Sequence, residues 1–65
     1  MVEKTLQIIA QRLREHEEQS TGALASGAVK DYAEYRELVG RIRGLRLAIS
    51  ETQDLLRNFE DLEDE

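Results

Sequence analysis

The chain contains no cysteine, no proline and a single histidine, His16. Without cysteine, disulfide bonds and thiolate metal sites are excluded, and one histidine is too few for a histidine metal cage within one chain. No nucleophile, base and orienting group can be assembled around His16. We therefore expect no enzymatic activity, no bound metal and no cofactor.

Long apolar runs are also missing. No stretch approaches the ~20 residues of a membrane span, and the N-terminal segment VEKTLQIIAQRLRE interrupts its apolar residues with polar ones, unlike a signal peptide. We expect a soluble intracellular protein. The net charge of −5 argues against general binding to nucleic-acid phosphates. Residues 48–65 carry one basic and seven acidic groups, so the excess negative charge lies in this last third.

The small size of the chain limits its stability. Its 65 residues make one domain, and a single core in so short a chain supplies roughly 3–5 kcal/mol at most. Since disulfides and metals are excluded, self-association is the remaining source of stability.

The strongest pattern lies in residues 31–62. Apolar residues recur there in alternating steps of three and four, with Thr52 filling one gap, which is the heptad rhythm of a helix that packs along one stripe. Asp31 and Glu34 form a capping-box pattern at the start of this helix. Its packing residues are Tyr35, Leu38, Ile42, Leu45, Ile49, Leu56 and Phe59.

A first helix is predicted over about residues 2–19. Val2, Leu6, Ile9, Leu13 and His16 repeat the same spacing, and Leu6, Ile9 and Leu13 are expected to pack against the second helix. Residues 20–30, STGALASGAVK, are rich in small residues and are predicted to form the connection. An acidic, frayed end is expected over residues 60–65 because its carboxylates oppose the helix dipole.

These lengths predict an all-α helical hairpin with unequal arms. At 1.5 Å per residue the second helix is roughly 46 Å long and the first roughly 26 Å. The shorter arm then covers the longer one only to about Thr52, and Leu55, Leu56, Phe59 and Leu62 need another subunit or another protein. We expect self-association, with a dimer forming a four-helix, coiled-coil-like bundle.

Two glycines, Gly40 and Gly44, lie away from the packing stripe on the side that also carries Leu47. Each costs about 1 kcal/mol relative to alanine in a helix. They are either tolerated on the surface or mark a second contact face, and we favour the contact face because two such costs on one side call for a reason. The four arginines between residues 36 and 46 lack an aromatic platform for nucleic acid and are read as flanking charges.

The stretch VKDYAEYRELVGRIRGLRLAISETQDLL, residues 29–56, resembles short helical proteins encoded among the head and connector genes of tailed bacteriophages. The resemblance rests on Val29-Lys30-Asp31-Tyr32, Tyr35-Arg36, Leu38-Val39-Gly40, Ile42-Arg43-Gly44-Leu45 and Asp54-Leu55-Leu56. It implies a structural or assembly protein of the virion that binds a capsid or connector protein, in the virion or the host cytoplasm. It brings no catalytic residues. The alternative function is an acidic regulatory binder that inhibits a host protein.

Overall fold

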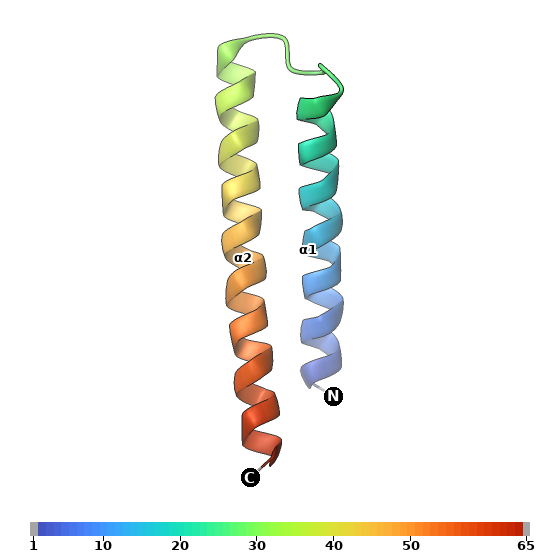
Figure 1. Cartoon of the computed structure of the whole chain (residues 1–65), viewed down its shortest axis with the longest axis vertical. Helices are drawn as coiled ribbons and strands as arrows, with labels where there is room; N and C mark the ends of the chain where they lie inside the picture. Colours follow the sequence, from blue (N-terminus) through green and yellow to red (C-terminus); the bar gives the residue numbers. More distant parts are fainter. Residues whose placement is uncertain (1, 65) are drawn as a thin grey trace.

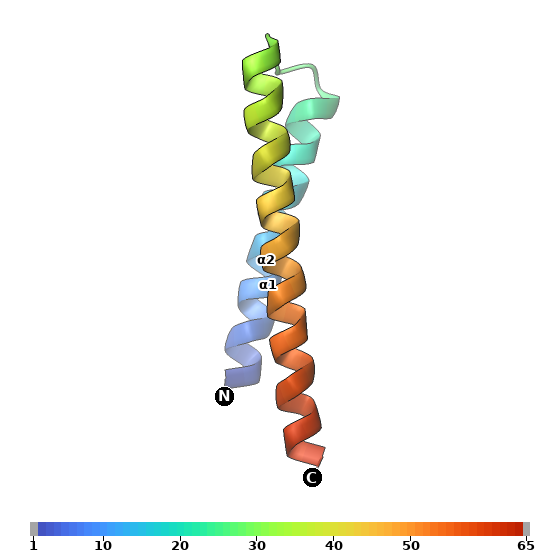
Figure 2. The same ribbon diagram turned by 90° about the vertical axis from the view of Figure 1, so that its left-hand side faces the viewer.

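The computed structural model describes residues 2–64 of the chain, with side chains described for residues 2–59. Two helices, α1 (Val2–Ala25) and α2 (Tyr32–Asp64), run side by side in opposite directions (Figure 1). The molecule measures 52 × 15 × 13 Å. Viewed from the side, α2 crosses over α1 and does not lie strictly parallel to it (Figure 2). The predicted all-α helical hairpin is confirmed.

Helix α1 is longer than predicted, because it continues through Ser20, Thr21 and Gly22 to Ala25. The Thr21 hydroxyl donates to the carbonyl oxygens of Glu17 (3.0 Å) and Glu18 (3.1 Å) inside the same helix. It therefore does not compete with the helix for backbone partners. Ser20 is 7% exposed, so this turn packs against α2. The sequence prediction of a connection from residue 20 is wrong: packing outweighs the weak helix preference of Ser, Thr and Gly.

Helix α1 ends in a Schellman motif at Gly27. The N–H of Ala28 donates to the carbonyl of Ala23 (3.3 Å), and the N–H of Gly27 donates to the carbonyl of Leu24 (3.4 Å). Gly27 has φ of 77°, a conformation that is strained for residues with a side chain. Of the two glycines in the predicted connection, Gly27 is the one that ends the helix.

Helix α2 begins at a cap formed by Asp31 and Glu34. The Asp31 carboxylate accepts from the backbone N–H of Glu34 at 2.8 Å. The Glu34 carboxylate accepts from the N–H of Lys30 at 2.9 Å, one residue earlier than in the usual capping box. Asp31 and Glu34 therefore satisfy backbone donors at the start of α2, where the sequence pattern places a cap. With Gly27, this cap limits the connection to six residues, 26–31.

An ion pair between Glu17 and Arg46 (3.4 Å) shows the register of the two helices. Val2 lies 15 residues before Glu17, so α1 continues beside the part of α2 that follows Arg46. Counted from the same pair, Ala25 lies opposite residue 38. Helix α1 thus covers α2 from about residue 38 onward, and α2 extends past α1 at both of its ends (Figure 1).

This register corrects the predicted cover of α2. Leu56 and Phe59 are half-buried, so the expectation that they have no partner within the chain is wrong. The cause is the length of α1, which at 24 residues spans roughly 36 Å. The side chains of Leu62 and of the acidic end, residues 60–65, lie outside the described residues.

The core between the helices is narrow. Its buried apolar residues are Ala10, Ile42 and Ile49, at 3%, 6% and 9% exposure. Two hydroxyl residues, Ser20 and Thr52, are buried with them, and the Thr52 hydroxyl donates to the carbonyl of Ala48 at 2.7 Å. Apart from these five residues, every described residue is half-buried or exposed.

Candidate interaction surface

The stripe by which α1 contacts α2 differs from the predicted one. Glu3, Leu6, Ala10, Leu13, Glu17, Ser20 and Leu24, spaced in steps of three and four, are the residues of this stripe, and all are buried or half-buried. Ala10 occupies the place that the sequence pattern assigns to Ile9, which is 43% exposed. Because alanine is small, the two helices can approach closely at Ala10, and Ile9 is displaced to the flank of the contact.

On α2, the predicted stripe is right in its middle and wrong at its start. Ile42 and Ile49 are buried, and Leu38 and Leu45 are half-buried. Tyr35 is 48% exposed because α1 has already ended opposite about residue 38. Its ring stacks instead on Tyr32 of the same helix, with centroids 6.3 Å apart. Tyr35 is therefore not part of the contact between the helices.

One flank of this contact carries a line of residues from each helix. In an antiparallel coiled coil, equivalent flanking positions of the two helices lie next to each other and recur every seven residues. A hollow of about 470 Å³ is lined by His16 and Ala23 of α1 and Arg41 of α2, so these two lines lie on the same side. We call this side the open face; its residues are Val2, Ile9, His16 and Ala23 of α1 with Arg41, Ala48 and Leu55 of α2.

The open face is bulky at one end and hollow at the other. Toward the chain termini, Val2, Ile9 and Leu55 are 53%, 43% and 50% exposed. Toward the connection, the hollow beside Ala23 and Arg41 also exposes parts of Leu38 and Leu45. Apolar surface thus runs along this side for much of the hairpin.

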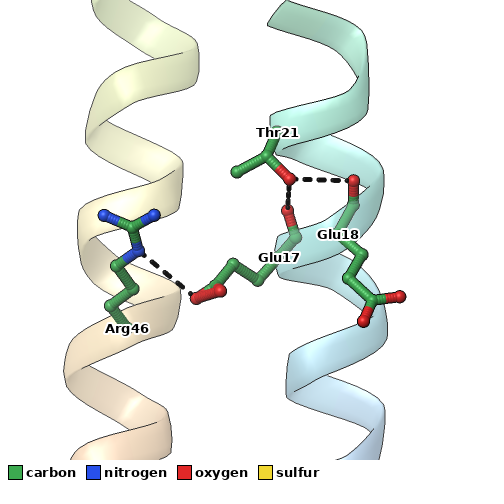
Figure 3. Close-up of polar contacts among 4 residues, drawn as sticks. All are labelled: Glu17, Glu18, Thr21 and Arg46. Atoms are coloured by element: carbon green, nitrogen blue, oxygen red, sulfur yellow. Dashed lines mark hydrogen bonds and ion pairs between the residues drawn. The ribbon is translucent and has the colours of Figure 1, made fainter. Parts of the chain in front are cut away.

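The opposite flank carries an ion pair. Arg46 and Glu17 point toward one another across the gap between the helices, and Thr21 lies one turn away on α1 (Figure 3). The Arg46 side chain is 63% exposed, so this pair is worth at most about 1 kcal/mol. A hollow of about 280 Å³ on this flank is lined by the polar residues Thr21, Arg43 and Arg46 and by the apolar residues Leu24, Val39 and Ile42. The open face differs from this flank in carrying three exposed large apolar residues, Val2, Ile9 and Leu55.

Among the described residues, the predicted glycine face has no neighbour. A Cβ atom added at Gly40 or Gly44 would meet nothing within 4 Å, and Leu47 is 63% exposed. These residues lie on the side of α2 that is turned away from α1. Any contact made by this face is therefore with another molecule.

Other kinds of site receive no support from the described residues. Among them, no group of three His, Cys, Asp or Glu side chains is placed to hold a metal ion. Within the same part of the chain, no helix combines the length and the apolar character needed to cross a membrane.

Sequence reasoning missed Ala23 as a residue of the open face. The usable signal is the seven-residue spacing of Val2, Ile9, His16 and Ala23, which becomes visible once α1 is extended to Ala25.

The fold and the surface together describe a two-helix hairpin with exposed apolar residues along one flank. No protein-family model matches the chain, and comparisons with curated proteins and with solved structures also find no significant match. The resemblance to phage head and connector proteins stays a prediction.

Proposed function

We propose that this protein is a non-enzymatic structural or assembly protein that self-associates into a dimeric four-helix bundle. The observation that carries the proposal is the open face, where Ile9, Leu55 and Val2 are about half exposed beside a narrow core. In a four-helix bundle these positions, with the half-buried leucines beside them, turn inward against a second hairpin.

The accessible surface supports an assembly larger than one chain. The hairpin exposes 5264 Å², whereas a compact monomer of 7.5 kDa exposes about 4,200 Å² by the usual size scaling. The excess of about 1,000 Å² is similar to the roughly 800 Å² that each partner buries in a standard interface. A second hairpin on the open face brings the exposed surface per chain to the range of stable small proteins.

We propose further that the dimer binds a phage capsid or connector protein, as the resemblance of residues 29–56 implies. Gly40 and Leu47 lie on the back of α2, away from α1, so this side remains accessible when the open face is covered. The alternative, an acidic inhibitor of a host protein, is supported only by the charge of residues 48–65.

Size-exclusion chromatography with light scattering tests self-association. We expect twice the 7.5 kDa chain mass at micromolar concentration, and a monomer at tens of micromolar overturns the dimer. Co-sedimentation with purified virions tests the assembly role. Presence at a fixed stoichiometry supports a virion component, whereas absence favours the regulatory binder.

A further inference from the structure

We infer that two copies pack through the open face in an antiparallel arrangement, with their connections at opposite ends of the bundle. A two-fold axis then passes near His16 and Ala48, and each helix lies against the same helix of the partner. The inference rests on the proposed self-association through the open face and adds the orientation of the second copy.

The shape of the open face favours this arrangement. Ile9 lies eight residues before Glu17 and Leu55 nine after Arg46, so both lie on the terminal side of the Glu17–Arg46 pair, at similar distances from it along the chain. Ala23 and Arg41 lie at a common height toward the connection, beside the hollow of about 470 Å³. Antiparallel packing places the bulky pair of one copy over the hollow of the other. If both connections lie at the same end, Ile9 and Leu55 face the same two residues of the other copy. The hollows of the two copies then also face each other and stay unfilled.

The spacing of the residues fits a two-fold axis at the same place. Ala48 is the midpoint of α2, which runs from Tyr32 to Asp64. Arg41 and Leu55 each lie seven residues from Ala48, and Ile9 and Ala23 each lie seven residues from His16. A rotation about this centre therefore exchanges Leu55 with Arg41 and Ile9 with Ala23, and the alanine at the centre lets the two α2 helices approach closely.

The charge of α2 points the same way. Residues 31–47 carry four basic and three acidic groups, whereas residues 49–65 carry one basic and seven acidic groups. Full antiparallel overlap of the two α2 helices places the segment of charge −6 beside the segment of charge +1. If both connections lie at one end, two segments of charge −6 are gathered at the other end, where like charges repel.

Cysteine crosslinking tests the orientation, and the chain has no native cysteine to interfere. A disulfide requires Cβ atoms about 3.5–4.5 Å apart. We expect Ala48→Cys to form a homodimeric disulfide under mild oxidation, and a mixture of Arg41→Cys and Leu55→Cys chains to form the mixed disulfide. Leu47→Cys, on the back of the same helix, is the matched control and should stay reduced.

The opposite orientation has its own signature. With both connections at one end, α1 faces the partner's α2, so a mixture of Ile9→Cys and Leu55→Cys chains crosslinks and Ala48→Cys does not. That result, or a dimer that forms neither set of disulfides, overturns the inference while leaving self-association intact. A monomeric mass by light scattering overturns the proposed function itself.

A second measurement needs no substitution in the dimer interface. A spin label on Ser26→Cys sits in the exposed connection, opposite about residue 37 and therefore about 11 residues from the centre at Ala48. Two labels in the antiparallel dimer are separated along the bundle by about 22 residues, or roughly 33 Å. A distance of about 20 Å or less, the width of the bundle, contradicts the antiparallel arrangement.

Discussion

Two neighbouring isoleucines provide a sharp test of the open face. Ile9 and Ile8 are 43% and 48% exposed on the same helix, but Ile9 lies on the open face and Ile8 lies outside it. We predict that Ile9→Ser weakens the dimer and that Ile8→Ser does not. Both changes alter helix preference equally, so the difference between them isolates the interface.

The expected loss of dimer stability follows from the exposed surface of Ile9. Full burial of an isoleucine side chain contributes about 1.5–3 kcal/mol, and 43% of this side chain remains exposed in the single hairpin. Covering that part contributes about 0.6–1.3 kcal/mol per copy on the same scale. Two copies lose about 1.3–2.6 kcal/mol, which raises the dimer Kd by roughly 10- to 80-fold.

Sedimentation equilibrium over a range of concentrations measures this Kd for the wild type and both variants. Circular dichroism at a concentration where each protein is fully dimeric serves as the control for intact helices. Equal weakening by the two serines, or a larger effect of Ile8→Ser, refutes the assignment of the open face as the dimer interface.

Three further predictions concern stability, measured by urea unfolding at one fixed protein concentration because self-association shifts apparent stability. Asp31→Ala should lower the free energy of unfolding by about 0.5–2 kcal/mol because it removes the helix cap, with a smaller loss for Glu34→Ala; a neutral Asp31→Ala contradicts the cap. Gly27→Ala should destabilise by about 1–2 kcal/mol because φ is positive there, whereas Gly22→Ala, inside α1, should stabilise by up to about 1 kcal/mol; the reverse order contradicts the Schellman end. Gly44→Ala should stabilise the protein by up to about 1 kcal/mol because nothing lies within 4 Å of the added methyl group. If Gly44→Ala also abolishes binding to virions, the glycine face contacts the partner. If binding persists, the glycine face has no role in that contact.

The heptad patterns of two segments, with a segment rich in small residues between them, were sufficient to predict a hairpin, and the pattern of α2 predicted the buried positions Ile42 and Ile49. These patterns failed where packing decides between adjacent residues. Hydrophobicity favours Ile9 for the contact stripe, but Ala10 occupies it, because close approach of two helices rewards a small side chain. No scale based on single residues contains that preference.

The end of α1 could not be predicted for a related reason. Ser20, Thr21 and Gly22 each favour a turn locally, yet Ser20 is buried and the Thr21 hydroxyl is satisfied within the helix. Only the presence of α2 alongside makes the continued helix favourable. The exposure of Tyr35 follows from the same boundary, since it depends on where the opposite helix stops.

The tyrosine pair at the N-terminal end of α2 determines what optical measurements of this protein report. The chain has no tryptophan and only two tyrosines, and both lie in the overhang before α1 begins to cover α2. Tyr32 is 71% exposed and Tyr35 is 48% exposed. Tyrosine fluorescence and the tyrosine bands of near-ultraviolet dichroism therefore monitor the loop end of the hairpin. Neither tyrosine lies on the open face, so these tyrosine signals do not directly report contacts made at its centre.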